Sequence, residues 1–447
     1  MNKTTNKIVS NKIISLIWIL LFTTFVSAQT KVNDVKTFTL KNGMKCIVLE
    51  DHAIPNVASY IFFRVGSRNE HPGITGLSHF LEHMMFNGAK KYGPKMFDTV
   101  MEAKGGSNNA YTNENVTVYT NFFPAYALET IFDLEADRIA TLSLDEKMVE
   151  SERGVIYSEY TQGYENNPFE LLYDQLLATA FYAHSYRWSV IGYESDILNW
   201  KRSDLKNYFD TYYAPNNAVA VFVGDVTVEH VKALAEKYFE PIPSREPPRP
   251  VYTKEPPQRG EKRLMVEKDV ASPHILIAYH VPESRAKDSV ALELLSAILS
   301  DGTSSRLHRS LVSDKQLASE INTFVPTALD PTLFSIAAVC AKGIDAAVLE
   351  KAIIEEIDRV IRDGVTDQEL QKAKNSMLVD FYREQETIKG KANNLGFYEV
   401  FFGNFKTMFD IPEDYKKVTK DEIKTVAATY LKKSNRTVGI MKKSEEK

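Results

Sequence analysis

Two segments of the chain carry the same succession of apolar and polar patterns. Each opens with apolar stretches rich in β-branched residues, which predict strands at 38–51, 56–67, 262–270 and 274–282. Each continues with a long helical pattern, near 76–87 or 288–300, and closes with an apolar strand, at 217–226 or 435–443. Further helices are predicted at 124–141, 145–163 and 345–362. The pattern indicates an α+β fold that contains a duplicated unit, and an ancient duplication is a hypothesis at this point.

A proline-rich stretch separates the two segments. It covers residues 241–262 and reads PIPSREPPRPVYTKEPPQRGEK. Dense proline without apolar periodicity is typical of an extended and fairly stiff linker. We therefore expect one domain at 30–240 and a second, homologous domain at 263–447. The length of 447 residues suits two domains, because a single core rarely grows beyond about 250–300 residues.

The composition is that of a globular protein and excludes some function classes. Hydrophobic residues make up 44% of the chain and charged residues 25%, with a net charge of −5. This balance does not indicate binding to nucleic acid or to an anionic membrane surface. The only cysteines are Cys46 and Cys340, on strand-like stretches of different predicted domains, so we expect two buried free thiols instead of a disulfide framework.

The N-terminus has the pattern of a signal peptide. Lys3, Lys7 and Lys12 precede an almost entirely apolar stretch, 13–26, which ends with small residues before the expected cleavage site at Ala28-Gln29. The stretch is shorter than the roughly 20 residues of a membrane span, although an uncleaved anchor remains an alternative. We expect residues 1–28 to be removed, which leaves no stable membrane span and a periplasmic or secreted protein.

The motif His79-Phe80-Leu81-Glu82-His83 is the main candidate for chemistry. In a helix, residues four apart lie about 40° from each other, so His79 and His83 share one face and can hold one metal ion together. Glu82 lies at the edge of that face, where a carboxylate can act as a general base. The alternative is that two helical histidines are simply buried or exposed, without a ligand.

A third metal ligand is predicted on the helix that contains ESERGVIYSEYTQG. Glu152 and Glu159 are seven residues apart and therefore lie on the same helical face. Two imidazoles and one carboxylate, with an open fourth position, form a common catalytic zinc site. Glu159 is the candidate ligand, and Glu152 is the candidate for orienting a histidine. Glu152 could instead be an ordinary exposed acid or pair with Arg153 or Lys147.

These residues resemble those of the pitrilysin, or insulinase-like (M16), zinc metallopeptidases. H-x-x-E-H is the inverzincin signature, and GSRNEHPGITGLSHFLEHMMFNG looks like the signature of this family. In the family the third ligand lies about 76 residues beyond the second histidine, in a segment of the form E-R-x-x-I-x-x-E. ESERGVIYSE places Glu159 at that spacing. The resemblance extends over the mature chain, whose length is similar to the short bacterial two-domain branch and to the subunits of the mitochondrial processing peptidase.

The resemblance implies a fold, a cofactor and a substrate class. Each domain is expected to be an antiparallel sheet with helices packed on it. One Zn²⁺ per chain is expected at His79, His83 and Glu159, and Glu82, assisted by Glu152, is expected to act through a zinc-bound water. NNAYTNENVTVY matches the stretch after the zinc helix, so Asn109 and Ala110 would lie on the edge strand that pairs with an extended peptide substrate.

One departure from the family concerns a polar pair in the second domain. The family has an Arg and a Tyr, seven residues apart, that position the substrate and stabilise the tetrahedral intermediate, but GTSSRLHRSLVSDKQLASEI has Val312 and Ser319 at those positions. Loss of such a donor typically costs about 10²–10³ in rate. We therefore expect a heterodimer in which a paralogous subunit supplies the Arg and the Tyr. The alternatives are that Lys315 or His308 replaces them.

Two other functions remain open beside that of an exported zinc endopeptidase for unfolded peptides. The chain could be a non-catalytic assembly subunit, because relatives of this family have become scaffolds. Those relatives usually lose the zinc motif, whereas this chain retains all four key residues, His79, Glu82, His83 and Glu159. The chain could also process one dedicated precursor peptide, which the sequence does not distinguish from general peptide clearance.

Overall fold

Two β-sheets with flanking helices form the main body of the protein in a computed structural model that describes residues 30–443. The predicted signal peptide, at residues 1–28, lies outside the described residues. The α+β class predicted from the sequence is confirmed, because strands and helices follow each other in both segments. Among the described residues, no helix combines the length and the apolar character that crossing a membrane requires.

The N-terminal sheet has six strands in the order β1-β2-β6-β3-β5-β4. Its strands are β1 (Lys36–Thr39), β2 (Lys45–Glu50), β3 (Asn56–Phe63), β4 (Ser107–Thr112), β5 (Thr117–Pro124) and β6 (Ala218–Gly224). All neighbouring strands are antiparallel except β2 and β6. Strand β4 ends the sheet, so its outer edge has no strand partner among the described residues.

The C-terminal sheet has five strands in the order β7-β11-β8-β10-β9. Its strands are β7 (Lys262–Glu267), β8 (His274–Val281), β9 (Ala318–Phe324), β10 (Thr332–Cys340) and β11 (Arg436–Lys442). Only β7 and β11 are parallel, which matches the parallel pair β2–β6 of the first sheet in position. Strands β7 to β11 therefore repeat the topology of β2 to β6, as the duplicated sequence pattern predicts, and β1 is an additional strand. Each parallel pair forms because the last strand enters between two earlier strands after a helical crossover.

Helices account for most of the remaining structure, and the ones that the sequence predicted lie within a few residues of the expected bounds. The first segment contains α2 (Leu77–Met84), α3 (Met96–Ala103), α4 (Leu128–Thr141), α5 (Glu146–Asn166), α6 (Pro168–Ala180), α7 (Glu194–Ile197), α8 (Arg202–Tyr212) and α9 (Val228–Tyr238). The second contains α10 (Ser289–Ser300), α11 (Ala346–Asp363), α12 (Asp367–Glu384), α13 (Ile388–Phe402), α14 (Ile411–Lys417) and α15 (Lys420–Tyr430). No helix or strand is formed from 243 to 261, which lies within the predicted linker.

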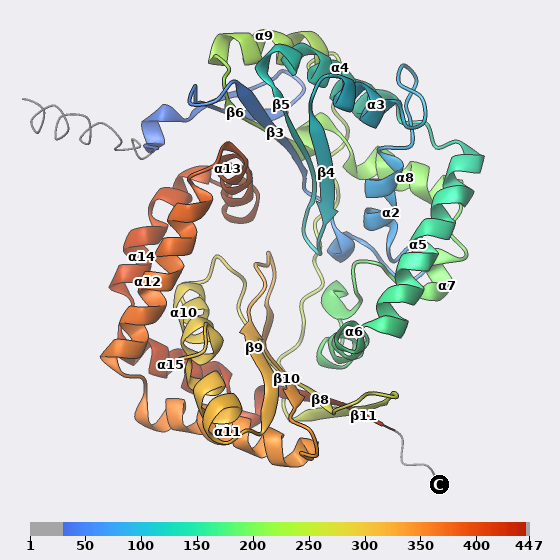
Figure 1. Ribbon diagram of the computed structural model, residues 1–447. Coiled ribbons are helices and arrows are strands. Elements are labelled where there is room, and N and C mark those ends of the chain that lie inside the picture. Colours follow the sequence, from blue (N-terminus) through green and yellow to red (C-terminus); the bar gives the residue numbers. More distant parts are fainter. Residues whose placement is uncertain (1–29, 444–447) are drawn as a thin grey trace, which may run out of the picture. The chain divides into compact units, whose positions relative to one another are not determined.

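The two segments exchange one helix each. Helix α13, from the second segment, packs on β3 and β6 of the N-terminal sheet, and α6, from the first, packs on β7, β8 and β11 of the C-terminal sheet (Figure 1). The contact of α13 is close, because a Cβ added to Gly396 would lie 2.0 Å from a ring carbon of the buried Phe62. Buried apolar residues of α6, including Leu172 and Leu176, form one core with Leu276 of β8.

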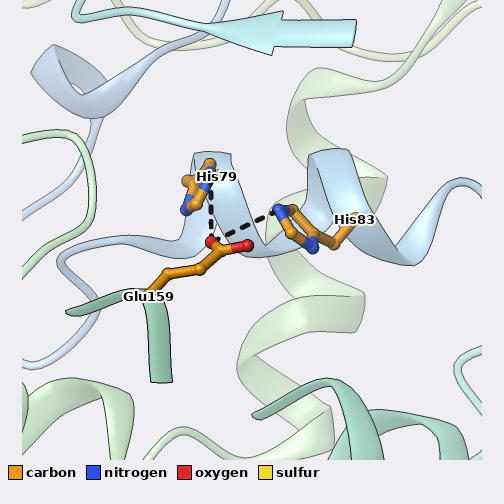
Figure 2. Close-up of side chains that lie close together, drawn as sticks. All are labelled: His79, His83 and Glu159. Atoms are coloured by element: carbon orange, nitrogen blue, oxygen red, sulfur yellow. Dashed lines mark ion pairs between the residues drawn. The ribbon is translucent and has the colours of Figure 1, made fainter. Parts of the chain in front are cut away.

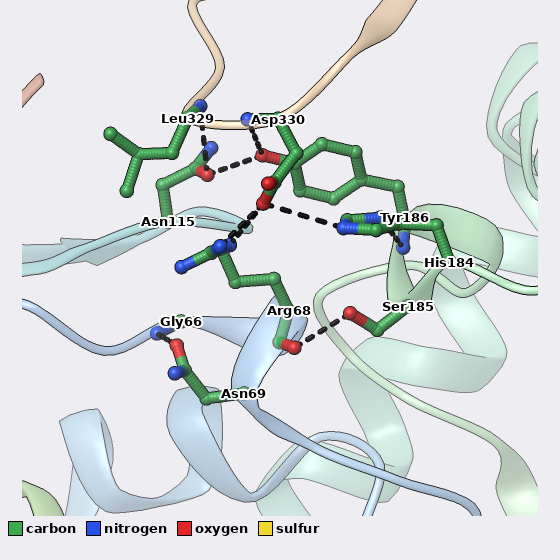
Figure 3. Close-up of polar contacts among 9 residues, drawn as sticks. All are labelled: Gly66, Arg68, Asn69, Asn115, His184, Ser185, Tyr186, Leu329 and Asp330. Atoms are coloured by element: carbon green, nitrogen blue, oxygen red, sulfur yellow. Dashed lines mark hydrogen bonds and ion pairs between the residues drawn. The ribbon is translucent and has the colours of Figure 1, made fainter. Parts of the chain in front are cut away.

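A polar cluster also joins the two segments near the start of α2, the helix that carries the H-x-x-E-H motif. Asp330, in the loop before β10, accepts a 2.9 Å hydrogen bond from Arg68 Nε and lies 3.3 Å from His184 Nε2 (Figure 3). Tyr186 donates its hydroxyl proton to Asn115, whose side-chain oxygen also accepts from the backbone N–H of Leu329. These contacts hold the loop before β10 against the segment that precedes α2.

Both cysteines are buried and free. Cys46 lies on β2 and Cys340 at the end of β10, each in the core of its own sheet. Burial raises the pKa of both thiols, to about 11 for Cys340, so neither is a thiolate at neutral pH. The expectation of two buried free thiols is confirmed.

Candidate metal and peptidase site

Helix α2 carries the H-x-x-E-H motif and is fixed firmly at its N-terminus. Gly76 precedes the helix with φ of 88°, and an added Cβ would lie 2.3 Å from the carbonyl oxygen of Ile191, so only glycine fits there. The buried carboxylate of Glu70 accepts hydrogen bonds from the backbone N–H groups of Gly76 (2.7 Å) and Ser78 (2.8 Å). These bonds satisfy donors that have no partner within the helix and set the position of the turn that carries His79.

The apolar face of α2 is packed against the N-terminal core. Leu77, Phe80, Leu81 and Met84 are fully buried, and the ring of Phe80 stacks on Trp200 with centroids 5.1 Å apart. His79, Glu82 and His83 lie on the remaining face and are only partly buried. Helix α2 therefore has one face of apolar residues that pack in the core and another face that carries the candidate ligands and the candidate base, as the helical spacing of the motif predicts.

His79, His83 and Glu159 meet at one point. One ligand atom from each residue lies within 4.8 Å of the other two. Glu159, on α5, places Oε2 3.9 Å from His79 Nε2 and 3.8 Å from His83 Nε2 (Figure 2). Two ligand atoms of a tetrahedral zinc site are separated by about 3.4 Å, so the three side chains need to move only slightly to share an ion. Two imidazoles and a carboxylate are also the donor set of catalytic zinc sites.

Glu152 is hydrogen-bonded to His83. His83 Nδ1 lies 2.8 Å from Glu152 Oε1. An ionised carboxylate can only accept, so this bond places a proton on Nδ1, and in the neutral ring the lone pair is then on Nε2, which faces Glu159. The alternative from the sequence is a salt bridge from Glu152 to Arg153 or Lys147. Within residues 30–443 Glu152 pairs with His83 instead, and Arg153 pairs with Glu150 at 3.0 Å.

Asn87 is a contributor that sequence reasoning missed. Its Nδ2 donates a 2.7 Å hydrogen bond to Glu152 Oε2. Both oxygens of Glu152 are therefore held, one by His83 and one by Asn87. Asn87 lies four residues after His83, just beyond the end of α2, and this helical spacing is the signal that could have identified it.

The surroundings shift the pKa values of the cluster in different directions. Burial and the neighbouring His83 lower the pKa of His79 to about 4, so its imidazole is neutral at pH 7. Burial also disfavours charge on His83, but the hydrogen bond to Glu152 and the nearby carboxylates outweigh it and raise its pKa. The hydrogen bond from His83 lowers the pKa of Glu152. Burial raises the pKa of Glu82, which suits a group that takes up a proton.

Glu82 points into a cavity of about 510 Å³ next to the cluster, and His83, Phe86 and Glu152 also line this cavity. Its Oε2 accepts a 2.6 Å hydrogen bond from the hydroxyl of Thr112. Asn109 and Ala110 line the same cavity from β4. The structure therefore brings the predicted base and the two predicted substrate-contact residues to one cavity beside His83.

Strand β4 has the geometry of a strand that could pair with an extended peptide. Its side chains alternate between exposed and partly buried positions, and Asn109 is exposed whereas Ala110 packs against the N-terminal core. Because β4 ends its sheet, its outer edge has no strand partner within residues 30–443, although the backbone N–H of Ala110 donates to the side-chain oxygen of Asn109 at 2.9 Å.

A second cavity, of about 300 Å³, is acidic. Glu159 lines it together with Glu114, Glu170 and Asp174, and its described lining contains no lysine or arginine. Partial burial raises the pKa of Glu114. The surplus of carboxylates next to Glu159 favours a cation in this cavity.

The positions of the missing Arg–Tyr pair lie on the second segment. Val312 belongs to a π-helical turn (His308–Asp314) and packs against the C-terminal core, and Ser319, on β9, donates its hydroxyl proton to the carbonyl oxygen of Val339 at 3.3 Å. Of the two alternative donors, Lys315 is engaged, with Nζ 3.2 Å from Glu356 Oε1. His308 Nδ1 is buried and has no hydrogen-bond partner within residues 30–443.

Comparisons with known proteins identify the family of the chain. The insulinase (peptidase family M16) family matches residues 46–193, which contain every predicted site residue, and the M16 inactive domain matches 199–377. The zinc protease PqqE of Helicobacter pylori is 31% identical over 93% of this chain and 94% of its own length. The mitochondrial-processing peptidase subunit beta of Lentinula edodes is 25% identical over 88% and 86%.

A solved structure shows the same similarity at the level of the fold. The crystal structure of a protease from Helicobacter pylori has a TM-score of 0.88, at 31% identity, over 91% of this chain and 99% of its own. The sequence match and the fold match both cover the two repeated segments. The chain belongs to the insulinase-like M16 peptidase family, in its short two-domain branch.

Proposed function

We propose that this protein is an exported zinc endopeptidase that cleaves unfolded peptides. Zinc, one ion per chain, is held by His79, His83 and Glu159, and Glu82 is the general base. Export rests on the N-terminal sequence, with its basic start, short apolar stretch and small residues before Gln29. The relative from Helicobacter pylori is named a zinc protease, which supports the same activity here.

The observation that carries the proposal is the convergence of three ligand atoms within 4.8 Å of one another. The hydrogen bond between His83 Nδ1 and Glu152 also supports the proposal, because it favours the tautomer that a metal ligand needs. The low pKa of His79 keeps the second imidazole neutral at physiological pH. A zinc ion at such a site activates a water molecule and polarises the carbonyl of the scissile peptide bond.

The remaining roles fall to the side chains around the three ligands. Glu82 takes the proton that the attacking water loses and passes it to the leaving amine, a role for which its raised pKa is suited. The outer edge of β4 pairs with the extended peptide and brings its backbone alongside Asn109 and Ala110. Pairing through the backbone gives affinity with modest demands on sequence, which suits unfolded peptides as substrates.

We further propose that the chain is the zinc-bearing subunit of a heterodimer. Neither Val312 nor Ser319 resembles the Arg or Tyr that the family has at these positions, and Lys315 is paired with Glu356. A paralogous subunit that carries the Arg–Tyr pair would supply the donors for the tetrahedral intermediate. The relative from Lentinula edodes is named as a subunit, which is consistent with a paired assembly.

The test measures zinc content and peptide hydrolysis for the wild type and Glu82→Gln. We expect about one zinc per chain in both proteins, with hydrolysis abolished in the variant. Glu150→Gln, an exposed residue on α5, is the control and should retain wild-type activity. Wild-type protein that binds no zinc would reject the mechanism.

The subunit proposal needs one more measurement. The chain is assayed alone and mixed with a candidate partner, chosen as a two-domain family member that carries the Arg–Tyr pair. The mixture should be faster by about 10²–10³, the typical value of such donors. Full activity of the chain by itself would refute the heterodimer and leave the zinc mechanism intact.

A further inference from the structure

Thr112 links the general base to the edge strand. It is the last residue of β4, and its hydroxyl donates to Glu82 Oε2 at 2.6 Å, the length of a strong bond to a carboxylate. Thr112 is paired across the strands with Thr117 of β5, which is fully buried. The position of the hydroxyl is therefore set by the sheet, whereas Glu82 is on a helix.

Strand β4 is hydrogen-bonded to neighbouring helices near both of its ends. The partly buried positions of the strand are Asn108, Ala110 and Thr112, which point to the same side. Asn108 Nδ2 donates a 2.9 Å hydrogen bond to Asp98 of α3, and Thr112 bonds to α2. Both ends of the strand are thus tied to the helices that border the cavity. The register of β4 and the place of Glu82 cannot change independently.

A second hydroxyl lies behind Thr112. Thr117 Oγ1 donates to the carbonyl oxygen of Val65 at 3.0 Å, so toward Thr112, 3.3 Å away, it can only accept. The Thr112 hydroxyl therefore lies between the Glu82 carboxylate and a buried hydroxyl that is itself bound to the backbone.

We propose that Thr112 is a positioning residue that fixes Glu82 relative to the peptide paired with β4. The proposal rests on the proposed function and deepens it. A peptide that adds to the outer edge of β4 takes its register from the strand, and Thr112 transfers the same register to the base. Proton transfer depends steeply on distance, because a displacement of about 1 Å can cost roughly 10²-fold in rate.

The test compares Thr112→Val with Thr112→Ser. Valine keeps the branched shape and removes the hydroxyl, and serine keeps the hydroxyl. For Thr112→Val we expect a fall in kcat of roughly 10-fold to 100-fold, with KM changed by less than about twofold because the backbone edge that binds the peptide is intact. Thr112→Ser should recover most of the loss. Thr437→Val, a buried threonine on β11 that bonds to Gln258, is the matched control and should resemble the wild type.

Two further readouts separate positioning from general damage. Zinc content should stay at about one per chain in all variants. Crystal structures should show the Glu82 carboxylate displaced in Thr112→Val and in its wild-type place in Thr112→Ser. A carboxylate that keeps its place in Thr112→Val, or a serine variant as impaired as the valine variant, would overturn the proposal. If the wild type neither binds zinc nor cleaves peptides, the proposed function fails, and the place of Glu82 in the two structures still decides the role of Thr112.

Discussion

Glu152→Ala removes the acceptor that holds both His83 and Asn87. The two hydrogen bonds, at 2.8 and 2.7 Å, are short, and the side chains of Glu152 and His83 are 16% and 21% exposed. Without Glu152, the proton of His83 is no longer fixed on Nδ1, and the ring can rotate away from Glu159. Loss of a partner that orients a ligand typically weakens metal affinity by about 10–100-fold, or about 1.4–2.8 kcal/mol.

The two hydrogen bonds of Glu152 should contribute unequally to zinc affinity. Asn87→Ala removes only the neutral donor and leaves the bond to His83, so we expect a smaller loss of zinc affinity, within about 10-fold. Glu150→Ala removes an exposed carboxylate two residues away that pairs with Arg153, and exposed pairs contribute about 0–1 kcal/mol. Its zinc affinity should match that of the wild type.

The assay is competition for zinc between each apo protein and a chelator of known affinity, at fixed pH. The predicted order of affinity is wild type and Glu150→Ala first, then Asn87→Ala, then Glu152→Ala. Circular dichroism confirms that each variant is folded. Folded Glu152→Ala protein that binds zinc within about twofold of the wild type would refute the role of Glu152, as would an equal loss in Glu150→Ala.

Three further predictions concern other parts of the molecule. Gly396→Ala places a methyl group against Phe62, so overpacking should lower the free energy of unfolding by about 1–3 kcal/mol, as measured by urea titration. Unchanged stability would show that α13 does not pack there as described. Burial raises the pKa of Glu70 from 4.5 to about 8, so this group contributes stability at low pH that is lost as pH rises from 5 to 8. The wild type should therefore lose more stability over this range than Glu70→Gln, and parallel pH profiles of the two proteins would contradict it. The acidic cavity beside Glu159 should favour peptides with Arg or Lys near the scissile bond. Asp174→Asn should therefore lower the kcat/KM for an Arg peptide relative to the kcat/KM for the same peptide with norleucine, and an unchanged ratio would exclude the cavity as a subsite.

Local patterns in the sequence predicted most of the elements and the cluster around His79. Helical spacing was enough to predict that His79 and His83 lie together, because residues four apart in a helix share a face in any fold. The site also needs α2 and α5 side by side, which periodicity does not encode, and the resemblance to a family supplied that pairing. Asn87 and Thr112 escaped notice because polar residues at the ends of elements are common and acquire a role only through contacts in three dimensions.

The exchange of helices between the two segments could not be predicted from the chain. The apolar faces of α6 and α13 indicate burial, but they do not say which sheet provides it. Gly396 and Gly439 are the residues of the sequence that reflect the exchange, because each leaves space for a side chain from the other segment. Phe62 lies against Gly396, and Leu172 lies against Gly439. A glycine within a helix or a strand has several explanations, so this signal is readable only once the structure is known.

The central claim is that zinc is held by His79, His83 and Glu159. Anomalous X-ray diffraction from crystals of the zinc-loaded protein, collected on both sides of the zinc absorption edge, tests it most directly. The account predicts one strong peak per chain between Nε2 of the two histidines and Oε2 of Glu159, and its loss in His79→Ala crystals. Zinc at another place in the chain, or no peak in crystals grown with excess zinc, would contradict it.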